Sequence, residues 1–257
     1  MHSPSITYQN KTEPFELQVA RGFIEGHRTA TVFGYNPDVD TSEVTVWPVA
    51  GMLTHPAAAL QMKVSSTNAN DTAAGTGART VTIQGLDANY VEISETVTLS
   101  GQTEVLTTNS FLRINYALVA TTGSGESAAG DIYFGTGTVT AGVPATIYNI
   151  IKFDFNNTVT GHYTVPAGYS GYLSQGLFSA GQASGSTQVR GRLLTTGVDN
   201  VRRTAAVTTV NNGVADYTFE YPLRIPEKTD LEATAIGSAN NNGVSCMFIL
   251  LLVRDNP

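Results

Sequence analysis

Short runs in which apolar and polar residues alternate recur along most of the chain, and this period of two predicts β-strands. Residues 90–99 (YVEISETVTL) show the pattern clearly and stop at Ser100-Gly101. Residues 15–20 (FELQVA) alternate in the same way and predict another strand. Residues 55–62 (HPAAALQM) are the one place where a helical turn or two fits. The pattern therefore predicts an all-β fold.

The predicted strands fall into two sets behind an N-terminal arm. Residues 1–50 predict a polar arm followed by extended strands, and residues 51–150 predict a β-rich domain that resembles a β-sandwich. Residues 151–257 predict a series of roughly eight strands without helices between them, which favours a jelly-roll β-sandwich. We therefore expect two β domains in sequence, with the boundary near residue 150.

Turn residues separate the predicted strands. Asn36-Pro37-Asp38 ends a strand over 29–35, and the segment from Gly85 to Asn89 is typical of a hairpin turn. Asn211-Asn212-Gly213 and the segment from Asn240 to Gly243 also predict hairpins, because Asn and Gly tolerate positive φ.

Composition narrows the classes of function. Charged residues make up 14% of the chain and its net charge is −7, without a dense Lys/Arg run, which argues against direct nucleic-acid binding. The longest apolar run, from Cys246 to Val253, has the length of a strand, so no membrane span is expected. The first residues lack a signal-peptide pattern, and the one cysteine cannot form an internal disulfide. We expect a protein made in the cytoplasm.

The four histidines show no recognisable catalytic or metal-binding pattern. His2 falls in the predicted arm, His55 precedes Pro56 in a loop, and His162 starts a strand. None of these, nor His27, lies at short spacing from another histidine or from cysteine, which argues against a zinc site. The order of a Ser-His-Asp triad along a chain is free, but the chain has no G-x-S-x-G motif. We expect the histidines to be structural.

Other candidates for chemistry also have structural interpretations. Cys246 precedes an apolar strand, where a thiol is usually buried packing. The loop from Asp71 to Arg79 lacks the G-x-x-x-x-G-K-[ST] pattern of a phosphate loop and leads into a strand. Asp38 with Asp40 lacks the acidic density of a calcium loop, and Glu92 and Glu95 fall on opposite faces of a strand. We predict no catalytic, cofactor or metal site, and a protein that is not an enzyme.

Two clusters bear on binding. Arg190, Arg192, Arg202 and Arg203 form a basic patch if their strands are neighbours, and in an acidic chain we interpret them as inter-subunit salt-bridge donors or solvated positions. Tyr163, Tyr169 and Tyr172, with the single Trp47, are candidates for a sugar-binding platform. Asn10, Asn70 and Asn156 match glycosylation acceptors, which carry little meaning without a secretory signal.

Three stretches carry a resemblance to a known family. Residues 70–101, which contain NDTAAGTGARTVTIQGLDANY, are similar to a segment that recurs in virion structural proteins of tailed phages, particularly marine and freshwater ones. Residues 163–168 (YTVPAG) and 225–230 (IPEKTD) resemble the same proteins. The likeness covers most of residues 25–250. It implies a virion component and carries over no catalytic residue.

The resemblance implies a capsid decoration (cement) protein on the outer capsid surface, whose partners are the major capsid protein and copies of itself, as a homotrimer. A tail, baseplate or fibre component is the alternative within the same class. A carbohydrate-binding, receptor-binding β-sandwich that recognises a host-surface glycan is the alternative from another class.

Overall fold

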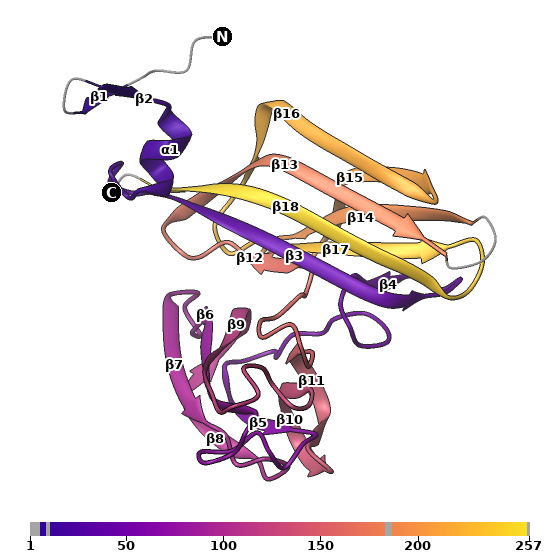
Figure 1. Cartoon of the computed structure of the whole chain (residues 1–257). Coiled ribbons are helices and arrows are strands. Elements are labelled where there is room, and N and C mark those ends of the chain that lie inside the picture. Colours follow the sequence, from indigo (N-terminus) through magenta and orange to yellow (C-terminus); the bar gives the residue numbers. More distant parts are fainter. Residues whose placement is uncertain (1–5, 9–10, 183–186, 256–257) are drawn as a thin grey trace.

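The computed structural model describes residues 6–8, 11–182 and 187–255. Within these ranges the chain has one six-residue helix, and every strand pair is antiparallel. The all-β prediction is confirmed. Figure 1 shows two β units, one above the other, with a small hairpin and the helix beside the upper unit. No described helix has the length and apolar character needed to cross a membrane.

The upper unit, here the sandwich, consists of two facing sheets. The front sheet has the order β16-β13-β18-β3, and the back sheet has the order β12-β17-β14-β15, with β4 paired to β17 (Figure 1). Its strands are β3 (His27–Val39), β4 (Val44–Thr45), β12 (His162–Thr164), β13 (Tyr169–Gly181), β14 (Gln188–Thr196), β15 (Arg202–Asn211), β16 (Gly213–Ile225), β17 (Asp230–Gly237) and β18 (Asn242–Arg254).

The core of the sandwich follows from alternation along its strands. In β18 every second side chain points inward and is buried, while the residues between them are only partly covered. The buried set of β18 packs with residues from both sheets in one apolar cluster; it comprises Val244, Cys246, Phe248, Leu250 and Leu252.

The lower unit, here the inserted domain, has its own core. Its two sheets have the orders β11-β10-β5-β8 and β7-β6-β9. A second apolar cluster, which shares no residue with the first, fills the space between them. Its strands are β5 (Leu60–Ser66), β6 (Ala78–Leu86), β7 (Glu92–Thr98), β8 (Val105–Phe111), β9 (Arg113–Thr122), β10 (Ile132–Thr140) and β11 (Val143–Ile151).

The domain organisation differs from the predicted division into 1–50, 51–150 and 151–257. Strand β3 pairs along most of its length with β18, and β4 pairs with β17, so the extended strands predicted within residues 1–50 belong to the C-terminal sandwich. The inserted domain lies in the connection between β4 and β12. Pairing between strands distant in the sequence produces this arrangement, and local patterns carry no information about it.

The described part of the first 26 residues forms a short hairpin of β1 (Ile6–Tyr8) and β2 (Lys11–Glu13), followed by α1 (Phe15–Ala20). The prediction of a strand over 15–20 is wrong. Gln18 and Val19 are buried and Phe15 is partly buried, so positions i, i+3 and i+4 share one face. Six residues are too few to distinguish the strand period of two from the helical period of 3.6. His2 and Asn10 lie outside the described residues.

Three segments predicted as turns that end strands or close hairpins have other positions in the fold. The helical turn predicted within 55–62 is absent. Pro37 and Asp38 lie inside β3, opposite a register shift, where a bulge on an edge strand tolerates proline. The turns at 211–213 and 240–243 connect β15 to β16 and β17 to β18, which belong to different sheets, so neither closes a hairpin. The turn after Gly85 does close a hairpin, between β6 and β7.

Candidate functional site

A polar cleft of about 740 Å³ lies between the inserted domain and the back sheet of the sandwich. One wall is β17 with the loop before β15, and the other is the β6–β7 turn and the start of β9. The segment from Leu53 to Ala59, which leads into the inserted domain, lines it as well. Interdomain clefts of this size are common ligand sites.

The pairing of β12 with β17 brings four polar side chains together, of which Asp230 and Glu232 line this cleft. His162 is opposite Glu232 and Thr164 is opposite Asp230. Side chains two apart on a strand share a face, so all four point away from the apolar core. The residue between the two acids, Leu231, points inward and is fully buried. Alternation in the sequence thus creates a polar row on the outside of the back sheet.

His55 completes a cluster with His162 and Asp230. The two imidazole centroids are 4.3 Å apart, and Nε2 of His162 lies 3.6 Å from Oδ1 of Asp230. One ligand atom from each of the three side chains lies within 4.8 Å of the others. Short spacing along the chain could not show that His55 and His162, on either side of the inserted domain, converge in the structure.

Arg113 of the inserted domain binds Asp230 of the sandwich. Its Nε and Nη2 atoms donate to Oδ1 and Oδ2, both at 2.9 Å. The hydroxyl of Thr164 also donates to Oδ1. Both side chains of the ion pair are nearly buried, at 11% and 13% exposed. This bidentate pair therefore connects the two units directly.

These contacts set the charges in the cleft. Burial alone would raise the pKa of Asp230, but the nearby His162 ring and the hydrogen bonds from Arg113 outweigh it and hold that pKa well below its ordinary value. Burial, followed by the neighbouring charges of His162 and Arg113, holds the pKa of His55 well below its ordinary value. At neutral pH Asp230 is therefore ionised and His55 is neutral.

The two carboxylates at the cleft are poorly arranged to act as general bases. Both oxygens of Asp230 accept hydrogen bonds from protein groups. Glu232, whose pKa burial raises, accepts from the Thr45 hydroxyl and lies 3.6 Å from Arg202. A general base needs an oxygen or nitrogen free to take a substrate proton. These two carboxylates are better suited to binding than to proton transfer.

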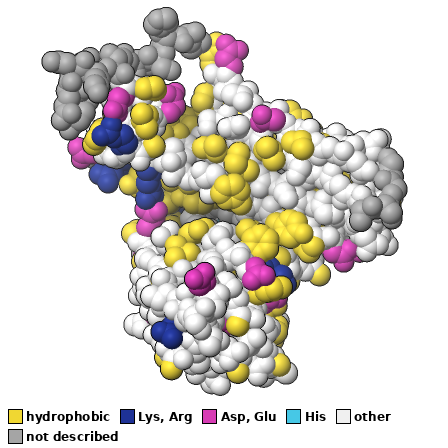
Figure 2. All heavy atoms as spheres, in the orientation of Figure 1, with side chains coloured by type: hydrophobic (Ala, Val, Ile, Leu, Met, Phe, Trp, Pro, Cys, Tyr) yellow, Lys and Arg dark blue, Asp and Glu magenta, His cyan; other side chains and the backbone are white. Residues whose placement is uncertain are grey.

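A second candidate surface is the outer face of the front sheet. Phe33, Met247 and Leu177 lie side by side on β3, β18 and β13, and Leu251 lies beside Tyr172. Phe33 is 50% exposed. Figure 2 shows hydrophobic side chains gathered over the front of the sandwich, with charged ones at its margins. A sheet usually presents polar residues to solvent, so this face is typical of an interface.

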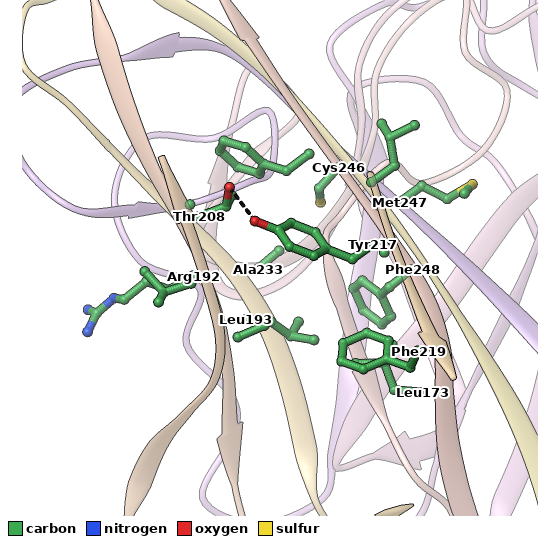
Figure 3. Close-up of a pocket in the computed structure, with 16 residues that line it drawn as sticks. Leu173, Arg192, Leu193, Thr208, Tyr217, Phe219, Ala233, Cys246, Met247 and Phe248 are labelled. Atoms are coloured by element: carbon green, nitrogen blue, oxygen red, sulfur yellow. Dashed lines mark hydrogen bonds between the residues drawn. The ribbon is translucent and has the colours of Figure 1, made fainter. Parts of the chain in front are cut away.

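A third feature is a groove at the edge of the sandwich, between β15 and β16. Figure 3 shows its apolar lining, which includes Leu193, Phe219 and Phe248, and Tyr217 extending across it. The Tyr217 hydroxyl donates to Thr208 at 2.9 Å and so links the two edge strands. The groove measures about 70 Å³. Small-molecule pockets measure about 300–1,000 Å³, so this one is a packing gap.

The other described candidates for catalysis or ion binding lie outside this cleft. Cys246 is buried in the core, and burial raises the pKa of its thiol to about 12. Glu92 binds Arg28, while Glu95 accepts from the backbone of β8, so the two do not share a ligand. Asp38 is exposed, and Asp40 accepts from the backbone of Asn241. His27 contacts Glu25 and Phe15 near α1.

The arginines do not form a common patch. Arg192 binds Glu43, Arg203 binds Asp199, and Arg202 lies near Glu232. These three arginines have acidic partners within the chain and are partly or largely exposed, and Arg190 is exposed as well.

The aromatic residues proposed for sugar binding lie in different surroundings, and Tyr172 is partly exposed beside Leu251 on the front sheet. Trp47 is 3% exposed, and its indole N–H donates to the carbonyl of Gly51. Tyr163 belongs to the sandwich core. Tyr169 is covered by the guanidinium groups of Arg28 and Arg254.

No family model matches the chain, and no curated protein matches it. Among solved structures, it is similar to the VP2 subviral particle of infectious bursal disease virus, with a TM-score of 0.24 and 8% identity over 90% of this chain and 73% of that one. The T13 particle of the same virus gives a TM-score of 0.21 and 9% identity over 89% and 73%. At these values neither fold nor function follows from the likeness.

Proposed function

We propose that the chain is a virion structural protein, specifically a capsid decoration (cement) protein that acts through protein–protein contacts. The sequence resemblance of residues 70–101, 163–168 and 225–230 to virion proteins of tailed phages supports the class. Eight sandwich strands, in the orders β3-β18-β13-β16 and β12-β17-β14-β15, have the arrangement of a jelly roll, a fold used in viral capsids.

The observation that carries the proposal is the apolar outer face of the front sheet. Strand β18 is apolar on both faces: Phe248 and Leu250 point into the core, and Met247, Ile249 and Leu251 point outward. One apolar face is enough to build a sandwich. The outward apolar face needs another protein surface to cover it. We assign this covering surface to neighbouring copies in a homotrimer.

The oligomer test changes one outward side chain. Phe33→Glu places a charge at the centre of the face and is expected to convert the trimer into monomers, measured by light scattering during size-exclusion chromatography. Val198→Glu is the matched control, because Val198 is 74% exposed in a loop away from this face. A wild-type chain that stays monomeric at all concentrations would contradict self-association through this face.

The location test uses intact virions. A cement protein should be present in a copy number close to that of the major capsid protein, measured by densitometry of a stained gel. Electron cryomicroscopy should place its density on the outer capsid surface. A few copies confined to the tail would overturn the capsid assignment and favour a tail, baseplate or fibre component.

A further inference from the structure

We propose that His55, His162 and Asp230 bind one divalent transition-metal ion of the Zn²⁺ class, which fastens the inserted domain to the sandwich. The inference is independent of the function proposed above. It concerns a cluster outside both apolar cores, in which two imidazole rings meet beside a carboxylate.

The geometry is close to that of a coordination sphere. Zinc binds nitrogen and oxygen ligands at about 2.0–2.2 Å in a tetrahedron, which places the ligand atoms roughly 3.3–3.5 Å apart. The Nε2 atom of His162 and Oδ1 of Asp230 are already 3.6 Å apart. All three candidate atoms lie within 4.8 Å of one another, so small side-chain rotations are enough to reach ligand distances.

The ligand set indicates the class of ion. Two imidazoles with one carboxylate suit zinc or another first-row transition metal, whereas Ca²⁺ and Mg²⁺ prefer sets made of oxygen. Three protein ligands leave a fourth position for water, and the cleft of about 740 Å³ beside the cluster provides room for it.

The surroundings orient the ligands. Thr164 and Arg113 hold the Asp230 carboxylate through hydrogen bonds, the kind of outer contact that fixes a metal ligand. The Arg113 cation weakens binding of a second cation, whereas the nearly buried Glu232 carboxylate, opposite His162 in the strand pair, offsets part of that repulsion. Within the described residues, no hydrogen bond holds the His55 ring, so it is free to turn toward an ion.

The three ligands come from different parts of the chain, which gives the ion a structural role. His55 precedes the inserted domain, His162 begins the first strand after it, and Asp230 belongs to β17. An ion bound to all three joins both connections of the inserted domain to the back sheet. It therefore stabilises the arrangement of the two units without taking part in either core.

The test measures Zn²⁺ binding to the full chain after treatment with EDTA and removal of the chelator. We expect one equivalent of Zn²⁺ by isothermal titration calorimetry, a rise in the midpoint of thermal unfolding, and a visible absorption band when Co²⁺ replaces Zn²⁺. His55→Gln should weaken binding by about tenfold or more. His27→Gln is the matched control, because His27 lies near α1 and should leave binding unchanged.

Two outcomes would overturn the proposal: no stoichiometric binding by the wild-type chain, or equal loss of binding in His27→Gln and His55→Gln. His162 is buried, so its substitution can impair folding. His55 is only partly buried on a connecting segment, and circular dichroism of His55→Gln without metal should match the wild type.

Discussion

At the scale of single residues, Asp71 organises the loops at one end of the inserted domain. Its side chain is fully buried. It accepts four hydrogen bonds of 2.5–2.9 Å, from the hydroxyl of Ser66 and the backbone N–H groups of Ala78, Ala129 and Gly130. The loop from Asp71 to Arg79 is therefore folded around its own carboxylate.

Asp71→Asn should destabilise the chain by about 3 kcal/mol, because an amide nitrogen cannot accept and leaves buried donors without partners. Urea unfolding measures the change. Asp38→Asn, at an exposed position, is the control and should stay within about 0.5 kcal/mol of wild type. Equal stability of both variants would contradict the role of the Asp71 carboxylate.

Cys246 should be inert in the folded chain. Burial raises the pKa of its thiol to about 12, from about 9 in the unfolded chain. The folded state keeps the thiol proton to a higher pH than the unfolded state does. The contribution of Cys246 to stability is therefore complete below about pH 9 and is lost as the pH rises toward 12. A thiol reagent at pH 8 should react with one equivalent in urea and with almost none in buffer. Rapid reaction in buffer would show that the sandwich opens.

At the scale of elements, β3 depends on a glycine where it passes the connections of the inserted domain. A Cβ at Gly34 would lie 2.6 Å from both Sγ of Cys246 and the carbonyl oxygen of Val46, and 2.8 Å from Cα of Gly161. Two of these neighbours are backbone and cannot rotate away. The close approach allows β3, β4 and the chain before β12 to pack together.

Gly34→Ala should therefore cost about 1–3 kcal/mol through overpacking, measured by urea unfolding. Gly181→Ala is the matched control at the end of β13, since nothing lies within 4 Å of the added Cβ. If Gly34→Ala were as stable as Gly181→Ala, the connections would have to be looser than the structure indicates.

At the scale of the whole molecule, two separate cores imply that the inserted domain can be removed. The sandwich cluster contains residues from 32–46 and 163–252 only. The backbone N–H of Gly161 donates to the carbonyl of Val46 at 2.9 Å, so the two ends of the insertion already touch. The sandwich should therefore not need the inserted domain for its fold.

Replacing residues 48–159 with Asn-Gly should leave a sandwich that unfolds cooperatively, at a lower temperature than the full chain because the back sheet loses its cover. Circular dichroism during heating measures this. Arg113→Ala in the full chain is the control, since it removes the ion pair to Asp230 and retains the domain. A variant without a cooperative transition would mean that the two cores depend on each other.

The sequence by itself determined the fold class, most strand positions and the burial of Cys246, because these depend on local alternation and on the apolar run at 246–253. Local patterns were too short to identify α1, and they could not show that β15 and β16 belong to different sheets.

Only the tertiary structure decided that β3 joins the C-terminal sandwich and that His55 meets His162 and Asp230. Both depend on contacts between residues more than 60 positions apart, and the energy of such contacts comes from burial and pairing that no local window contains. The polar row on β12 and β17 follows from alternation in the sequence. The sequence does not show that Arg113 of the inserted domain binds Asp230 in this row.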